Sequence, residues 1–356
     1  MENLLKLSVL DVERKYSCQY EETVYGNDNI VSYGKDNAAP NLFKNCYKES
    51  ATLSSIINGS VNYICGDEVI VNEQAYSMVE QVNRKRMTMR QFIANLAQSY
   101  MIYGGFAFQI IYSKVGIPVE FYPLDFSRCR TNEDGTKIFY NKKGWSKYTT
   151  KANVYDAYGV KKLRDTDVFY YKGDFTSNVY PLPPYFAAIK DVLTEIECAT
   201  YSLNSVSNGF AAKHILNIPE AGNLTDEQKR DIEMAIKTKF CGSDADVNFM
   251  LFWNNGEQAL DIKKIEGDDS PERYITIKKD ARSNIYAAMR CTPNLFGLPT
   301  ETTGFNSQEY SSAFKLYQRT VISPIQDIII ESISKIFKSK NVVTIKPFVI
   351  KFDEEQ

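Results

Sequence analysis

Histidine is almost absent from this sequence, since His214 is the only one among 356 residues. Every catalytic arrangement that pairs a serine or cysteine nucleophile with a histidine base would depend on that one side chain. It stands beside Ile215 and Leu216 at the end of an expected amphipathic helix, where a packing or capping role is the simpler interpretation. The sequence identifies no catalytic residue, and we expect a protein that is not an enzyme.

Paired cysteines and long apolar runs are lacking too. The seven cysteines stand singly, without a CxxC pair, which favours reduced thiols and synthesis in a cytoplasm over a disulfide framework. No stretch approaches the roughly 18 uncharged apolar residues that cross a membrane, and the N-terminus does not read as a signal peptide. We therefore expect neither secretion nor membrane insertion.

An excess of charge of one sign is also missing. The formal net charge is -2 and neither half of the chain is strongly basic, which argues against a dedicated nucleic-acid-binding protein. The one tight basic cluster comprises Arg84, Lys85 and Arg86 together with Arg90. Its simplest interpretation is a solvated helix end.

Metal and cofactor motifs are not present. Acidic pairs such as Asp244 and Asp246 lack EF-hand spacing and are typical of solvated turns. Gly297 and Gly304 match neither a P-loop nor a dinucleotide fingerprint, because no GK[ST] follows and no strand precedes them. We expect no metal and no cofactor.

What is present indicates a large α+β protein. With 44% hydrophobic residues the chain can bury a substantial core, and its length predicts two or three packed units. Residues 40–182 combine helical stripes with runs of period two, notably Phe106 to Tyr112 and Pro118 to Leu124. Within them, Thr88-Met89-Arg90-Gln91 is a capping box that starts a helix. These residues predict one α+β unit.

A long helix, a small module and a second helix are expected next. The first helix follows the proline-rich boundary at Tyr180–Tyr185 and runs through residues 183–213. The module, residues 214–270, shows a capping box at Thr225–Gln228 and two expected strands, Val247–Trp253 and Ala259–Ile265. The second helix covers residues 271–292.

The last quarter is a loop followed by one long helix. Proline and glycine punctuate residues 293–306, and Asn306 fits the N-cap of a helix over 307–338. Pro324 should kink that helix, because proline lacks an amide donor and crowds the carbonyl of Thr320. One apolar stripe faces a partner along it; its members are Tyr310, Phe314, Tyr317, Val321, Ile325, Ile328, Ser332 and Ile336. A strand is expected within Val342–Phe352.

Six short segments, in this order and spacing, resemble the portal protein of tailed bacteriophages and their prophages. They are Tyr33–Pro40, Tyr103–Ala107, Tyr180–Tyr185, Gly209-Phe210 with His214–Leu216, Thr292–Gly297 and Gly304–Glu309. The resemblance runs from about residue 33 to the C-terminus. It implies a non-enzymatic homo-oligomeric ring, usually a dodecamer, at one vertex of the capsid, made in the host cytoplasm.

The resemblance also implies a portal fold with a defined division of the chain. The parts are an N-terminal arm (1–39), a wing α+β domain (40–182), stem helix 1 (183–213), a clip (214–270), stem helix 2 (271–292), a tunnel loop (293–306), a long kinked wing helix (307–338) and a C-terminal strand and tail (339–356). Because the sequence ends soon after that strand, the helical crown of longer members is expected to be short or absent.

Site residues and partners follow from the same resemblance. The channel-facing residues of the tunnel loop would be Thr300, Glu301, Thr302, Thr303, Phe305 and Asn306. Double-stranded DNA would pass through the ring without sequence specificity during packaging and ejection. The protein partners would be the large terminase subunit, a head–tail adaptor, and the major capsid protein or scaffold, with Arg84, Lys85, Arg86 and Arg90 contacting DNA or the shell.

Two rival functions remain open from the sequence. Another phage head or adaptor protein would lack the order of stem helix, clip and stem helix. A hydrolase of cell-wall or polysaccharide substrates would need a pair of carboxylates in a cleft, and nothing in the sequence places such a pair.

Overall fold

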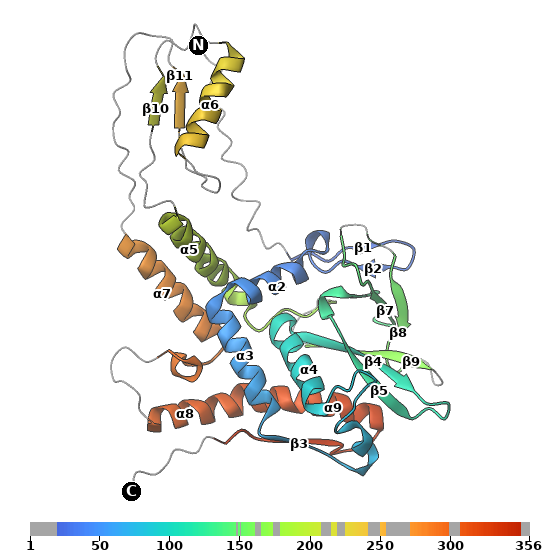
Figure 1. Ribbon diagram of the computed structural model, residues 1–356. Helices are drawn as coiled ribbons and strands as arrows, with labels where there is room; N and C mark the ends of the chain where they lie inside the picture. Colours follow the sequence, from blue (N-terminus) through green and yellow to red (C-terminus); the bar gives the residue numbers. More distant parts are fainter. Residues whose placement is uncertain are drawn as a thin grey trace. The chain divides into compact units, whose positions relative to one another are not determined.

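The computed structural model describes residues 20–146, 149, 151–160, 165–173, 179–207, 215–218, 225–240, 250–253, 271–298 and 307–349 (Figure 1). These residues fall into two compact units, which divide between 193 and 194 and between 281 and 282. Both divisions lie inside helices, so the larger unit contains the start of one long helix and the end of another.

The first half of the larger unit contains the helices α2 (Ala39–Glu49), α3 (Ala51–Cys65) and α4 (Met89–Tyr103), and local capping explains where the last two begin. The Ser50 hydroxyl accepts the Leu53 amide at the start of α3. Thr88 and Gln91 form both bonds of the predicted capping box at the start of α4, and Gly104 ends that helix in the left-handed region.

Two three-stranded antiparallel sheets follow (Figure 1). The first has the order β5-β4-β9, from β4 (Gly105–Tyr112), β5 (Pro118–Leu124) and β9 (Thr166–Lys172). The second has the order β6-β7-β8, from β6 (Cys129–Thr131), β7 (Lys137–Tyr140) and β8 (Asn153–Asp156). A short hairpin of β1 (Val24–Tyr25) and β2 (Ile30–Val31) lies on the N-terminal side. The α+β class predicted for this region is confirmed.

Strand β8 lies in a stretch of the sequence, residues 142–164, that is polar and has no clear period of two. It is an edge strand paired with β7 alone, and Val154 is half exposed. A strand that buries little apolar area carries a weak alternation signal, which explains why the sequence did not reveal it.

The C-terminal strand is shorter than expected and has its own partner. Strand β12 (Val343–Lys346) pairs antiparallel with β3 (Glu68–Val71) in a two-stranded sheet, apart from the β5-β4-β9 sheet. Pro347 follows directly, and proline cannot donate to a strand ladder. The expected strand therefore stops at Lys346, and its last residues, 350–352, lie outside the described part of the chain.

Among the long helices, two run from one unit into the other, namely α5 (Ile189–Ser207) and α7 (Pro271–Ala288). Two lie wholly in the larger unit, namely α8 (Ser307–Tyr317) and α9 (Ser323–Phe337). Helix α5 begins later than expected, after a short 3-10 turn at Phe186–Ala188 that follows the prolines. Between α8 and α9 the chain stays helical through a π turn, Gln318–Ile322.

The smaller unit contains a parallel strand pair. Strands β10 (Ile215–Ile218) and β11 (Met250–Trp253) run parallel, with α6 (Asp226–Phe240) between them in sequence. The sequence suggested that Ile215 and Leu216 lie at the end of a helix. That expectation was wrong, because both residues belong to strand β10. A parallel pair needs a crossover, and α6 supplies it. The expected strand at 259–265 and His214 lie outside the described residues.

Candidate functional site

The first part of the loop at 293–306 is anchored on the core of the larger unit. Residues Pro293–Phe296 form a 3-10 turn, and Gly297 ends it in the left-handed region. The Leu295 side chain is buried, and its carbonyl accepts the Tyr63 hydroxyl at 3.2 Å. The Phe296 ring lies edge-on to Tyr63 of α3 and Tyr317 of α8, with centroids 6.1 and 5.8 Å away. This segment is thus fastened to two helices, α3 and α8.

The absence of a side chain at Gly59 lets the Phe296 ring approach helix α3 closely. A Cβ atom at that position of α3 would lie 2.7 Å from two ring carbons of Phe296. The ring therefore packs directly on the helix backbone. The predicted channel residues Thr300, Glu301, Thr302, Thr303, Phe305 and Asn306 lie outside the described residues, so their role stays a prediction.

Pro324 is the second residue of α9, which begins directly after the π turn. The Ser323 amide donates to the Gln318 carbonyl, five residues back, which is the bond of a π turn. Proline at 324 has no amide for the Thr320 carbonyl, so a wider turn immediately before it matches the missing donor. The helix tolerates Pro324 by inserting this turn.

The basic cluster does not converge on one point. The Arg84 Nε pairs with Glu120 Oε1 at 2.9 Å, while Arg90 donates to the Asp67 carbonyl at 3.0 Å. The Lys85 backbone amide is held by Asn83, and Arg86 has a φ of 57°. Arg90 also lines a cavity together with Tyr63 and Asp67. Contact of these four cations with DNA or a shell stays a prediction.

Three of the six recognised sequence segments meet at one buried junction. The rings of Tyr33 and Tyr180 stack with centroids 4.3 Å apart, and the Tyr33 hydroxyl donates to the Pro181 carbonyl at 2.6 Å. A Cβ atom at Gly104 would lie 2.2 Å from the Leu182 carbonyl oxygen. Glycine is needed there both for its φ of 80° and for this close approach. These segments, distant in sequence, therefore form one packing unit.

Burial makes the tyrosines of this junction very weak acids. Both rings are fully buried, and desolvation raises the pKa of Tyr33 and of Tyr180 well above the usual value. Their hydroxyls act as hydrogen-bond donors to backbone carbonyls of Pro181 and Val31. The junction is a structural clamp between the N-terminal segment and the start of the long helix, not a centre for proton transfer.

A model of the family described as phage portal protein matches residues 50–356. The chain belongs to this family. The match covers most of the sequence, and it confirms the resemblance inferred from the six segments. The portal family is a structural class of virion protein.

A similar sequence and similar solved structures are consistent with membership of this family. A probable portal protein of Haemophilus phage HP1 is 25% identical over 264 residues, which cover 73% of this chain and 72% of that protein. Among solved structures, a chain in the virion of a native gene transfer agent particle has a TM-score of 0.57 at 15% identity, covering 92% of this chain and 85% of its own length. An HK97 family phage portal protein from Corynebacterium diphtheriae has a TM-score of 0.52 at 10% identity, covering 85% and 93%. These likenesses establish the portal fold.

The part of the chain that the structure describes contains neither a membrane-spanning helix nor a cluster of metal ligands. None of the helices there is both long and apolar enough to span a membrane. Within the same residues, no three His, Cys, Asp or Glu side chains gather in a way that could hold a metal ion.

Proposed function

We propose that this chain assembles into a homo-oligomeric ring of twelve copies, which forms the DNA channel at the capsid vertex of a phage-like particle. The large terminase subunit drives double-stranded DNA through the ring during packaging, and the DNA leaves by the same channel. The match of residues 50–356 to the portal family carries this proposal. The neck of a gene transfer agent particle that resembles this chain (TM-score 0.56, 18% identity) was computed with C12 symmetry.

Exposed apolar side chains support an assembly of identical subunits. In the smaller unit, Leu203 is 65% exposed and Ile275 57% exposed, on helices α5 and α7. In the larger unit, Leu316 of α8 is 66% exposed. A closed ring would cover such helix faces with the same surface of each neighbour.

The anchored turn at Pro293–Phe296 supports a tunnel loop. Leu295 and Phe296 fix the start of the loop on α3, and we take residues 300–303 as the tip of that loop. Threonine and glutamate dominate this tip, and each phosphate contact by a cation would add salt-sensitive adhesion to DNA. Thr300, Glu301, Thr302, Thr303, Phe305 and Asn306 are therefore our candidates for a weakly adhesive channel lining.

In this proposal, the remaining partners contact different parts of the chain. The clip, residues 214–270, meets the terminase motor and later the head–tail adaptor. The wing, which includes Arg84, Lys85, Arg86 and Arg90, faces the capsid shell or scaffold and the packaged DNA. The protein is made in the host cytoplasm and ends in the virion.

The decisive test is the mass of the purified protein by light scattering, with negative-stain images of the same fractions. Rings with a central hole and about twelve copies are expected. Deleting residues 300–304 should leave ring assembly intact and reduce DNA packaging or retention. A protein that stays monomeric both alone and with its shell or scaffold protein would contradict the proposal, and another kind of ring would favour a head or adaptor component.

A further inference from the structure

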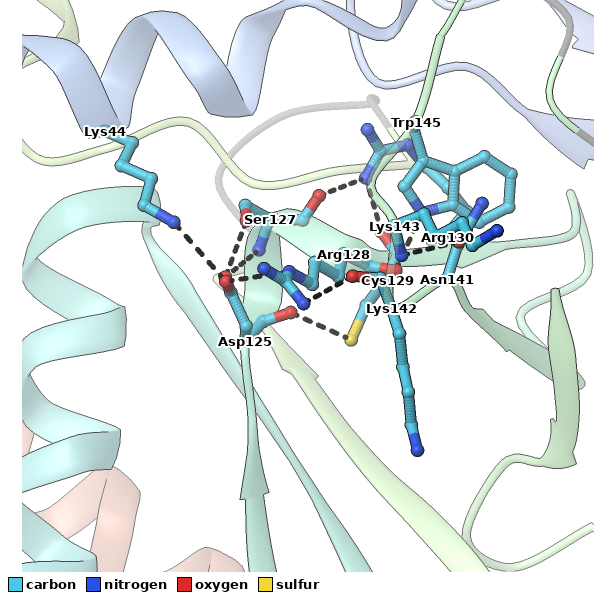
Figure 2. Close-up of polar contacts among 10 residues, drawn as sticks. All are labelled: Lys44, Asp125, Ser127, Arg128, Cys129, Arg130, Asn141, Lys142, Lys143 and Trp145. Carbon is cyan, nitrogen blue, oxygen red and sulfur yellow. Dashed lines mark hydrogen bonds and ion pairs between the residues drawn. The ribbon is translucent and has the colours of Figure 1, made fainter.

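A cationic cavity lies in the larger unit, and Figure 2 shows the polar contacts of several of its lining residues. Its volume is about 390 Å³. The lining residues are Asn41, Lys44, Ser127, Arg128, Arg130, Lys143, Gly144, Trp145, Ser146 and Thr149. Four of these are cations, and none of these lining residues is an aspartate or glutamate.

Arg130 is the buried cation of this cavity. Its side chain is 1% exposed, and its guanidinium lies over the rings of Tyr33 and Trp145 at 5.6 and 5.2 Å. Its hydrogen bonds go to the side chain and carbonyl of Asn37 and to the carbonyls of Ser127 and Cys129. Each of these acceptors is neutral, so dipoles and rings solvate the charge while no carboxylate in this set neutralises it.

One carboxylate borders the cations, and it is already shared. Asp125 Oδ2 lies 3.4 Å from Lys44 Nζ and 3.3 Å from Arg128 Nε. The other oxygen of Asp125 accepts the hydroxyl and the amide of Ser127. The lining residues carry four positive charges, and Asp125 carries one negative charge. The cavity therefore has an excess of three positive charges. Such an excess in a concave site attracts an anion.

The size of the cavity and the exposure of its side chains indicate which kind of anion fits it. A volume of about 390 Å³ is that of a small-ligand pocket, large enough for a few side chains and too small for a DNA duplex. Trp145 is only 8% exposed and its Nε1 donates to the Arg128 carbonyl, so its ring offers no open face to a stacking base. Lys44 and Arg128 already converge on a carboxylate oxygen. Carboxylates on an inserted protein segment fit these features best.

We propose that this cavity is a docking site for an acidic segment of a partner protein. Aspartate or glutamate side chains of the partner enter between Lys44, Arg128 and Lys143, and Arg130 stabilises them from below. The site is built from one chain, so it does not require the ring.

Trp145 provides a direct readout, because the chain has only two tryptophans. In a full-length Trp253→Phe protein, Trp145 is the sole tryptophan. Titration with octaglutamate at low salt should change its emission in a saturable way. Octaglutamine at the same concentrations should leave the emission unchanged. A protein whose emission octaglutamate does not change would overturn the proposal.

Matched variants test the position of binding. The pair Lys44→Gln with Lys143→Gln lowers the charge excess from three to one, and Arg84→Gln with Lys85→Gln removes two charges elsewhere. The first pair should weaken octaglutamate binding at least fivefold and the second less than twofold, with unchanged circular dichroism. Lys143→Gln alone gives a milder form if the pair folds poorly.

Three results contradict the assignment. Equal weakening by both pairs would mean non-specific attraction. An equal emission change with inorganic phosphate at matched ionic strength would mean a site for free oxyanions. A loss of duplex DNA binding in the Lys44/Lys143 pair, without a loss of octaglutamate binding, would mean a nucleic-acid site.

Discussion

Phe296 shows how a single residue fastens the start of the loop at 293–306 to the core of the larger unit. Its ring touches the backbone of α3 at Gly59, and Tyr63 and Tyr317 flank it. Alanine normally stabilises a helix interior relative to glycine by about 1 kcal/mol. Here the added methyl would meet the ring at 2.7 Å, so the usual gain should be reversed.

We therefore expect Gly59→Ala to lower the free energy of unfolding in the native sequence and to raise it in a Phe296→Ala background. Phe296→Ala alone should cost about 1–2 kcal/mol, less than the 3–5 typical of a fully buried phenylalanine, because the ring is only half-buried. Urea unfolding of the three variants, followed by circular dichroism, measures this. Stabilisation by Gly59→Ala in both backgrounds would show that the ring does not rest on α3.

At the scale of the element, the π turn changes which residues of the long helix are buried. A regular helix continued from Tyr317 places Ile328 on the apolar face. The structure instead buries Ile329 and Ile333 completely, and Ile328 is only half-buried. One extra residue in the turn rotates all later side chains by about 100° around the axis. The predicted stripe was wrong at Ile328, whereas its other members beyond the turn, Ile325, Ser332 and Ile336, are buried.

Because of this rotation, Ile328 and Ile329 should contribute differently to the free energy of unfolding. Ile329→Ala should cost about 2–5 kcal/mol, as for a buried aliphatic side chain, and Ile328→Ala clearly less. Thermal or urea unfolding of the two variants provides the comparison, and the substitutions remove identical atoms. Equal costs, or a larger cost at Ile328, would mean that the helix winds through Pro324 without the extra residue.

At the scale of the whole molecule, buried tyrosines link distant segments of the larger unit. Tyr180 donates to the Val31 carbonyl, and Tyr185 donates to the Ile102 and Phe43 carbonyls. Burial raises the pKa of Tyr33, Tyr180 and Tyr185. The folded protein therefore keeps these protons at alkaline pH, whereas the unfolded chain releases them near pH 10.

The contribution of these tyrosines to stability should consequently be complete below about pH 10 and be lost as the pH rises further, by about 1.4 kcal/mol per pH unit for each such tyrosine. Urea midpoints at pH 8 to 11, with tyrosinate absorbance at 295 nm, test this. Tyr185→Phe should flatten the decline, with some loss at pH 8 from its missing hydrogen bonds. Ionisation of every tyrosine near pH 10 in a protein that stays folded would contradict it.

Local signals in the sequence predicted much of the fold and the family. The capping box at Thr88, the glycine stop at Gly104 and the period of two in β4 and β5 act within a few residues, so the sequence shows them directly. Segments such as Tyr33–Pro40 and Tyr180–Tyr185 also pointed to the portal family. Their order, however, gave no hint that they stack on each other.

By itself, the sequence determined the class, the main helices and the family, because those rest on local hydrogen bonding and on short segments in a fixed order. Only the tertiary structure decided that β12 pairs with β3, that Phe296 rests on Gly59, and that Lys44 shares a cavity with Lys143. Each of these contacts joins residues that lie far apart in the sequence. No periodicity encodes such pairings, since they depend on how already formed elements pack together.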